Sequence, residues 1–127
     1  MHTWTPGTFR LSAMRATPYP NRLLEFSVTL PETQLRVLNL LIRLTLGWHA
    51  GTGHERRSTT TITIAQLTKR VKRTAAASVA EALAALIQSG VIEIYVTDGG
   101  SLEIADLVKN RRRNLTICLV RSWVEEQ

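Results

Sequence analysis

The sequence predicts an α+β fold, and the spacing of its apolar residues is the main reason. Two long stretches carry apolar side chains three and four residues apart, which is the period of a helix. Each stretch is followed by a glycine, Gly47 or Gly90, the residue type that most often ends a helix. After Gly90 the apolar residues alternate with a period of two, as they do in strands. We therefore expect mainly helices before Gly90 and strands after it.

The N-terminal part is expected to contain an arm, a short helix and a long helix. Residues 1–18 show no sustained periodicity and form the expected arm, which a turn with two prolines joins to a short helix over residues 22–26. The long helix follows, because Pro31 suits a first helical position, and it ends at Gly47. Its core-facing stripe is expected to comprise Leu35, Leu38, Leu41, Ile42, Thr45 and Leu46.

The middle of the chain predicts a loop, a strand and a short helix. Residues 49–60 are polar and contain glycine, which indicates a loop or the tip of a hairpin. The β-branched residues at 59–64 favour a short strand. Thr63 and Gln66 then have the spacing of a capping box, so a short helix is expected through about Val71.

A second long helix and a β-hairpin complete the expected fold. Residues 74–89 are rich in alanine, which is intrinsically helix-forming. A strand is expected at 91–97, a hairpin turn at the Asp-Gly-Gly sequence of 98–100, and a returning strand at 102–104. The β-branched and apolar residues at 115–120 predict a final strand.

The expected order is helix, strand, helix, turn, helix, strand, basic loop and strand. A three-helix core capped by a β-hairpin wing is the winged helix-turn-helix arrangement. Residues 64–89 would supply the two helices of the helix-turn-helix, and the helix that begins near Thr74 is the candidate recognition helix. We expect one such domain over residues 19–121, with the N-terminal arm before it and a short tail at 122–127.

The composition is that of a basic globular domain. The chain has 127 residues, of which 44% are hydrophobic, and a formal net charge of +6. A small domain this basic usually binds a polyanion, either nucleic acid or an anionic membrane surface. The sequence has neither a secretory signal nor an apolar stretch long enough to cross a bilayer. We therefore expect a cytoplasmic protein without a membrane partner.

No group of residues in the sequence has the spacing of a catalytic or metal site. The three histidines lack a carboxylate or cysteine at a metal-binding spacing, and no phosphate-cradling glycine-rich loop occurs. The single cysteine, Cys118, lies in an apolar run and is expected to be a buried structural thiol. The sequence therefore predicts a binding protein rather than an enzyme, with no cofactor and no metal.

Basic residues gather in three groups. One lies in the turn before the candidate recognition helix, one between the last two strands, where a wing would be, and one in the loop after the first long helix. Cations on loops that flank a recognition helix are placed to contact phosphates at the rim of a groove. At the start of that helix, Thr74 and Ser78 are candidates for DNA contacts or for helix caps. The candidate DNA-binding residues are Lys69, Arg70, Lys72, Arg73, Thr74, Ser78, Lys109, Arg111, Arg112, Arg113, Arg56 and Arg57.

The start of the candidate recognition helix is poor in hydrogen-bonding groups. Residues 75–77 are alanines, which offer base edges little beyond contact with a thymine methyl group. We therefore expect the affinity to come mainly from the basic loops. Trp4, Trp48 and Trp123 are candidates for stacking on unpaired bases, but packing inside the fold is the expectation for each.

Three motifs follow one another between residues 19 and 94. They are Tyr19-Pro20-Asn21-Arg22-Leu23-Leu24, the helix from Gln34 that closes with Gly47-Trp48, and the stretch from Ile62 to Ile92. In this order and spacing they resemble the N-terminal DNA-binding domain of the phage replication protein O family. The resemblance implies a winged helix that binds duplex origin DNA in a phage or plasmid replication initiator. The chain departs from the family at the alanines of 75–77. The 127 residues hold no counterpart of the family's C-terminal region, so we expect either a fragment of a longer protein or a protein that works without that region.

Two other functions stay open at this point. A small transcription regulator would use the same fold, either as a homodimer or as several copies on repeated sites. A winged-helix protein-interaction module, for example a phage inhibitor of a host enzyme, would use the alanine-rich helix as a packing surface. The expected partners are therefore double-stranded DNA, further copies of the chain, and a replication or host protein.

Overall fold

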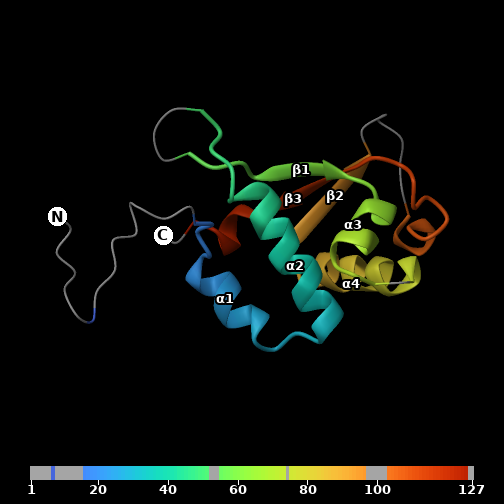
Figure 1. Ribbon diagram of the computed structural model, residues 1–127, viewed down its shortest axis with the longest axis horizontal. Coiled ribbons are helices and arrows are strands. Elements are labelled where there is room, and N and C mark those ends of the chain that lie inside the picture. Colours follow the sequence, from blue (N-terminus) through green and yellow to red (C-terminus); the bar gives the residue numbers. More distant parts are fainter. Residues whose placement is uncertain (1–6, 8–15, 52–54, 74, 97–102, 126–127) are drawn as a thin grey trace, which may run out of the picture.

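The computed structural model describes residues 7, 16–51, 55–73, 75–96 and 103–125. Within these residues the chain forms four α-helices and one three-stranded antiparallel sheet, which confirms the predicted α+β class. Figure 1 shows the helices on one side of the sheet. The elements are α1 (Asn21–Ser27), α2 (Glu32–Thr45), β1 (Thr59–Ile62), α3 (Ile64–Arg70), α4 (Ala76–Gln88), β2 (Ile92–Val96) and β3 (Leu115–Leu119), with short 3-10 helices η2 (Ile104–Asp106) and η3 (Arg121–Trp123).

The last strand in the chain occupies the middle of the sheet. The strand order is β1-β3-β2, and both pairings are antiparallel. Because successive side chains of a strand point to opposite faces, β3 buries every second residue and turns Thr116 and Cys118 outward. Thr59 of β1 and Glu93 of β2 flank Cys118 in the register, so the outer face is polar. The β3 residues that reach the core are Leu115, Ile117 and Leu119.

The long helix α2 is the centre of the core. It packs against α4 and against the sheet. The predicted core-facing stripe is confirmed except at Leu35, which is half-buried, and Val37 is buried instead. Burying one aliphatic side chain contributes roughly 1.5–3 kcal/mol, so this helix holds its neighbours in place. Its buried residues are Val37, Leu38, Leu41, Ile42 and Thr45.

The helix α3 begins with the predicted capping box. The Thr63 hydroxyl accepts a hydrogen bond from the Gln66 N–H at 3.1 Å, and the Gln66 side-chain carbonyl accepts one from the Thr63 N–H at 3.0 Å. A residue that caps a helix no longer continues a strand. The strand β1 therefore ends at Ile62, two residues before the predicted end at Ile64.

The second long helix is confirmed with a later start than predicted. The helix α4 begins at Ala76, and Ala75 before it has an extended backbone and no side chain that could cap the helix. The predicted start, Thr74, which is also a candidate DNA contact, lies outside the described residues. The predicted end is confirmed, because α4 ends at Gln88 and Gly90 follows.

The predicted β-hairpin is wrong at its second strand. Where a returning strand was expected at 102–104, Glu103 has no regular structure and Ile104 begins the helical turn η2. The turn at 98–100 and residue 102 lie outside the described residues. The partner of β2 is β3, whose alternate apolar residues cover the core. An Asp-Gly-Gly sequence indicates where a strand stops but not which strand it pairs with.

The loop predicted after α2 is a short hairpin. His49 and Arg56 form an antiparallel bridge, and the Arg57 N–H donates to the Trp48 carbonyl at 3.0 Å. Residues 52–54 at its tip lie outside the described residues.

The N-terminal helix and the C-terminal residues are joined through Trp123. The Arg22 guanidinium lies 4.2 Å from the centre of the Trp123 ring and donates to the Ser122 carbonyl at 2.8 Å. Phe26 also contacts this ring, with 5.0 Å between the ring centroids. Trp123 and Val124 pack against the core. The body of the domain therefore reaches at least Val124.

The arrangement as a whole is compatible with a winged helix. Three helices, α2, α3 and α4, pack around one core, and the antiparallel sheet covers it. In the described part of the chain, no helix has the length and apolar character needed to cross a bilayer.

Candidate nucleic-acid interface

The turn between α3 and α4 carries the first basic group. The Lys72 N–H donates to the Lys69 carbonyl at 3.2 Å, and the Arg73 N–H donates to the Thr68 carbonyl at 3.0 Å. These two bonds form a Schellman motif, whose central residue has a left-handed backbone and is usually glycine. Here the central residue is Lys72, with a φ of 58°.

The end of α4 contains the same motif with a glycine. The Gly90 N–H donates to the Ile87 carbonyl at 2.9 Å, the Val91 N–H donates to the Leu86 carbonyl at 3.2 Å, and Gly90 has a φ of 76°. A left-handed backbone at a residue that has a side chain lowers the stability of the fold by roughly 1–2 kcal/mol. Among the described residues, Lys72 is the only non-glycine with a positive φ. Residues held under such strain cluster at functional sites, which makes Lys72 a candidate contact.

An ion-pair network holds this turn against α2. The Arg36 guanidinium donates to the Val71 carbonyl at 3.1 Å. The Glu32 carboxylate lies 2.7 Å from the Arg36 guanidinium and 3.2 Å from that of Arg73. The hydrogen bond from Arg73, followed by the charge of Arg36, lowers the pKa of Glu32. Arg73 is thus engaged within the fold, and the exposed basic residues of the turn are Lys69, Arg70 and Lys72.

The segment 103–114, between β2 and β3, carries the second basic group. Leu107 is 2% exposed and anchors the segment to the core. The Asn110 side chain donates to the Asp106 carbonyl at 2.8 Å, which keeps the segment compact. The Ala65 N–H of α3 donates to the Arg111 carbonyl at 2.9 Å. Of its basic residues, Lys109, Arg111 and Arg112 are exposed and Arg113 is half-buried.

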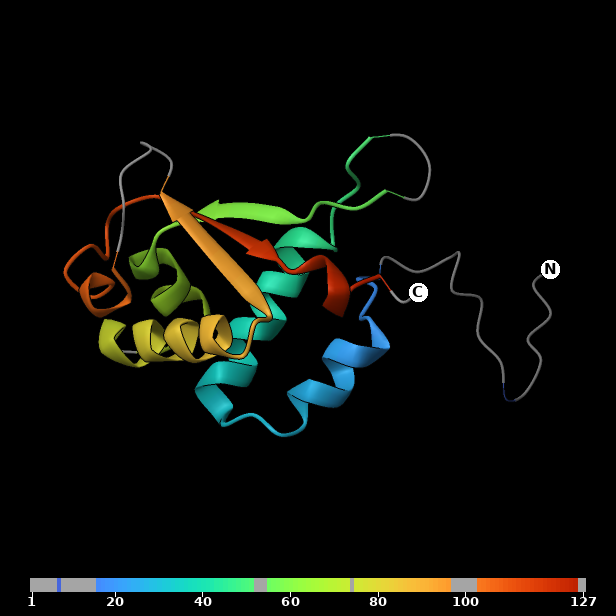
Figure 2. The ribbon, with the colours of Figure 1, turned by 180° about the vertical axis from the view of Figure 1, so that it is seen from behind.

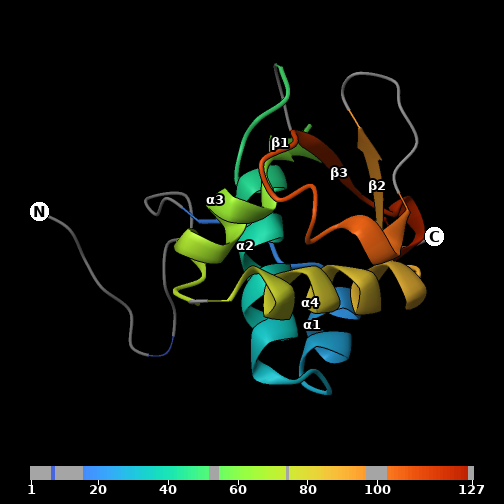
Figure 3. The same cartoon turned by 90° about the vertical axis from the view of Figure 1, so that its right-hand side faces the viewer.

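These two basic segments lie at opposite ends of α3. The turn follows the C-terminal end of the helix, and the Arg111 carbonyl is bonded to its first turn. A helix of 7 residues spans about 10 Å. Figure 3 shows α3, α4 and the segment 103–114 on the same side of the molecule. We call the surface formed by Lys69, Arg70, Lys72, Lys109, Arg111 and Arg112 the basic face.

The exposed side of α4 has no basic residue. Its exposed residues are Ala77, Glu81 and Gln88. Ser78, the other predicted contact, is half-buried and lines a groove together with Glu32 and Glu81. The polar side chains that α4 could offer to a base edge are Ser78, which the sequence analysis named, and Glu81 and Gln88, which it did not. Neither Glu81 nor Gln88 lies near a group of basic residues in the sequence, so the charge pattern that indicated the other candidates did not indicate these two.

The third basic group lies at the other end of the molecule. The hairpin that carries Arg56 and Arg57 projects from the end of the sheet that is remote from segment 103–114 (Figures 1 and 2). The Arg56 guanidinium donates to the Leu46 carbonyl at 3.3 Å, just after α2. Arg57 is exposed. The structure therefore brings two of the three predicted basic groups together and leaves this one apart.

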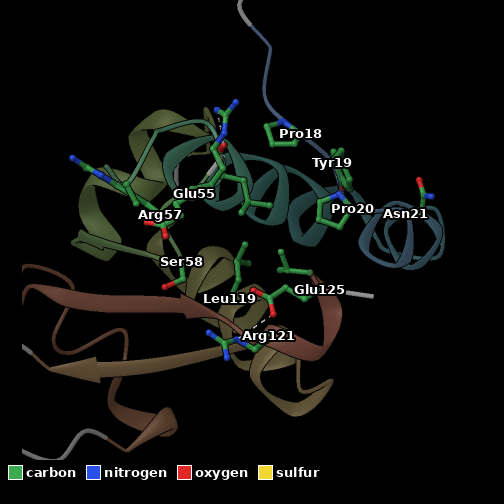
Figure 4. Close-up of a pocket in the computed structure, with 14 residues that line it drawn as sticks. Pro18, Tyr19, Pro20, Asn21, Glu55, Arg57, Ser58, Leu119, Arg121 and Glu125 are labelled. Carbon is green, nitrogen blue, oxygen red and sulfur yellow. Dashed lines mark hydrogen bonds and ion pairs between the residues drawn. The ribbon is translucent and has the colours of Figure 1, made fainter. Parts of the chain in front are cut away.

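An open groove of about 1190 Å³ lies beside this hairpin. Figure 4 shows it between residues 18–21, the hairpin and the C-terminal residues. Arg57 and Arg121 line it, and Arg121 pairs with the Glu125 carboxylate at 3.5 Å.

Trp48 contradicts the expectation that it packs inside the fold. It is 50% exposed. The guanidinium carbons of Arg43 and Arg57 lie 5.7 Å and 5.8 Å from the centre of its ring. Trp123, in contrast, packs against the core as expected, and Trp4 lies outside the described residues. Apolar residues are buried more often than not, and that general rule misled the sequence analysis at this position.

The expected buried thiol of Cys118 is only half-buried, because β3 turns it to the outer face of the sheet. Partial burial, followed by the nearby Glu93 carboxylate, raises the pKa of this thiol, which keeps it protonated at neutral pH. Over the described residues, no group of three or more histidine, cysteine, aspartate or glutamate side chains could hold a metal ion.

Comparisons of the chain with protein-family models, with curated proteins and with solved structures find no match.

Proposed function

We propose that the chain is a winged-helix DNA-binding module that holds the phosphates of duplex DNA on the basic face. The observation that carries this proposal is the placement of two basic segments at the two ends of α3, beside α4. In a helix-turn-helix, α4 would lie in the major groove, whose width is about 12 Å. The turn before α4 and the segment 103–114 would then meet the phosphate backbone.

Phosphate contacts supply most of the affinity in this proposal. Lysine and arginine that neutralise phosphates release condensed counterions, which drives binding without regard to sequence. The first turn of α4 has no side-chain cap, so its N–H groups add a partial positive charge beside Lys72. Base contacts are few, because α4 offers only Ser78, Glu81 and Gln88.

Within this proposal the chain is the DNA-binding part of a phage or plasmid replication initiator. The support for this finer role is the resemblance of residues 19–94 to the phage replication protein O family. Few base contacts per copy favour repeated origin sites that several copies occupy together.

A salt-titrated binding assay with the full chain tests the proposal on three duplexes. They are the replication origin of the genome that encodes the chain, the promoter of its own gene, and a random sequence. We expect the tightest binding at the origin. Tightest binding at the promoter would select a transcription regulator instead, and no measurable binding to any duplex would contradict the proposal.

A protein-interaction module is the second candidate, because the exposed side of α4 combines alanines with Glu81 and has no cation. Ala77→Arg separates the two candidates. It adds a cation toward DNA but places a bulky side chain on a packing surface. DNA binding predicts equal or tighter duplex binding, whereas a protein-binding helix predicts loss of partner binding. The paired change Arg111→Ala and Arg112→Ala separates the candidates in the opposite direction. If the chain binds DNA, this change should weaken duplex binding. If the chain binds a protein through α4, the change should leave partner binding intact.

A further inference from the structure

Trp48 is an exposed aromatic residue between two cations. Its exposed fraction is 50%, and the Arg43 and Arg57 guanidinium groups lie within 6 Å of the ring centre, at 5.7 Å and 5.8 Å. Arg43 comes from the last turn of α2, and Arg57 directly follows the bridge between His49 and Arg56. Two separate elements therefore place positive charge beside the same ring.

The backbone around this ring is held by hydrogen bonds. The Trp48 N–H donates to the Thr45 carbonyl at 3.1 Å, and the Trp48 carbonyl accepts the Arg57 N–H at 3.0 Å. Gly47 has no room for a side chain, because a Cβ there would collide with the Arg43 carbonyl. The indole is therefore presented to solvent by a fixed backbone rather than by a loose loop.

The second described tryptophan shows what a structural arginine–tryptophan pair looks like in this chain. The Arg22 guanidinium lies 4.2 Å from the Trp123 ring centre, and Phe26 packs on the same ring. At Trp48 both guanidinium groups lie at the outer limit of such contacts, and no aromatic ring among the described residues packs against it. Because half of the Trp48 side chain is exposed to solvent, its ring is accessible to another planar group.

We propose that Trp48, Arg43 and Arg57 form a binding site for an unpaired DNA strand. A base stacks on the indole, and the two arginines meet the phosphates on either side of that nucleotide. A base inside a duplex is already stacked on its neighbours, so this site selects single strands. The site lies at the end of the molecule remote from the basic face, and it stands independently of the proposed duplex binding.

The groove beside the hairpin offers the strand a path away from Trp48. Arg57 belongs both to the Trp48 site and to the wall of the groove. Arg56 and Arg121 also line the groove. Two carboxylates also line it, Glu55 and Glu125, and the second is paired with Arg121. Because these carboxylates repel phosphates, we expect the strand to follow the arginines and not to fill the groove.

Binding of a labelled oligodeoxythymidylate to the full chain tests the proposal. Thymidine strands do not pair with themselves, so they report on unpaired DNA alone. We expect the strand to quench the tryptophan fluorescence of the chain. Trp48→Phe should remove the quenching and keep most of the affinity, because phenylalanine still stacks. Trp48→Ala should weaken binding about ten-fold or more, which is the usual effect when one stacked base is deprived of its aromatic partner.

Two controls separate this site from the rest of the molecule. Trp123→Phe changes the packed tryptophan and should leave both the quenching and the strand affinity as they are. Lys72→Ala changes the basic face and should weaken duplex binding while leaving strand binding unchanged. Because Trp48 is half exposed, its variants should keep the thermal stability of the parent chain, which a melting curve verifies.

Several results would overturn the proposal. One is equal strand affinity of the parent chain and the Trp48→Ala variant, and another is no strand binding by a chain that binds duplex. Tighter binding to an oligouridylate than to the thymidine strand would overturn the assignment to DNA. Strand binding that depends on Trp48 in a chain that fails to bind duplex would support this site and contradict the proposed function.

Discussion

At the residue scale, Lys72 is the position where the stability of the fold and the proposed duplex binding would be most directly opposed. The chain contains two Schellman motifs, and it places glycine in one and lysine in the other. The lysine accepts backbone strain that glycine would avoid, and residues under such strain cluster at functional sites.

We predict that Lys72→Gly stabilises the fold and weakens duplex binding. Relief of the left-handed strain should raise the free energy of unfolding by about 1 kcal/mol, measured by urea denaturation. The loss of one protein cation that contacts a DNA phosphate should reduce the slope of log affinity against log salt concentration by about 0.9. A variant that binds duplex as tightly as the parent chain would remove Lys72 from the interface.

Two variants serve as controls for that prediction. Lys72→Ala removes the charge but keeps the strain, so it should weaken binding without stabilising the fold. Gly90→Ala creates the same strain in the second motif, where an added Cβ would meet no atom within 4 Å. It should therefore destabilise the fold by about 1 kcal/mol and leave binding unchanged.

Gly47 is required by close packing rather than by its backbone conformation. An added Cβ would overlap the Arg43 carbonyl and crowd the Thr17 hydroxyl. We predict that Gly47→Ala lowers the free energy of unfolding by about 1–3 kcal/mol, because the backbone after α2 must shift. An unchanged denaturation midpoint would contradict the claim that close packing at Gly47 fixes the backbone that exposes Trp48 to solvent.

At the scale of elements, the contact between α2 and the α3–α4 turn depends on Glu32. Arg73 and Arg36 lower the pKa of this carboxyl in the folded state. Its contribution to stability is therefore fully present above the ordinary glutamate pKa of about 4.3 and is lost as pH falls through the lowered pKa. Glu32→Gln should be less stable than the parent chain at neutral pH, and the difference should vanish in acid. Denaturation at a series of pH values measures it, and a difference that persists unchanged at low pH would contradict this role.

The segment 103–114 depends on one anchoring side chain. Leu107 is 2% exposed, whereas its neighbour Val108 is 40% exposed. We predict that Leu107→Ala lowers the free energy of unfolding by about 2–5 kcal/mol, the range for a large aliphatic residue removed from a core. Val108→Ala is the matched control and should change stability little. Equal effects of the two variants in urea denaturation would show that the segment is not anchored in this way.

Local signals predicted the elements more successfully than their partners. The capping box of Thr63 and the glycine at 90 act over a few residues, and both are found where the sequence placed them. The pairing of β2 with β3 joins residues that the segment 103–114 separates, and no local pattern specifies it. The ion pair between Glu32 and Arg73 has the same origin in tertiary structure.

At the scale of the whole molecule, the sequence predicted which basic groups exist but not how they are distributed. Two groups share a face with α4, because α3 is short and both are tied to it. The hairpin group lies at the other end, beside an exposed Trp48. We propose duplex DNA for the first surface and an unpaired strand for the second, an arrangement that would suit a protein acting where strands separate.

The salt dependence of duplex binding reports directly on whether the basic face neutralises DNA phosphates. The measurement compares the parent chain with a variant in which Lys69, Arg70 and Lys72 are all alanine, by anisotropy of one labelled duplex over a range of salt concentrations. We predict weaker binding by the variant and a log–log slope that is smaller by about 0.9 for each phosphate that the variant no longer neutralises. An unchanged slope and affinity, in a variant that still folds, would contradict the claim that the basic face holds the phosphates of duplex DNA.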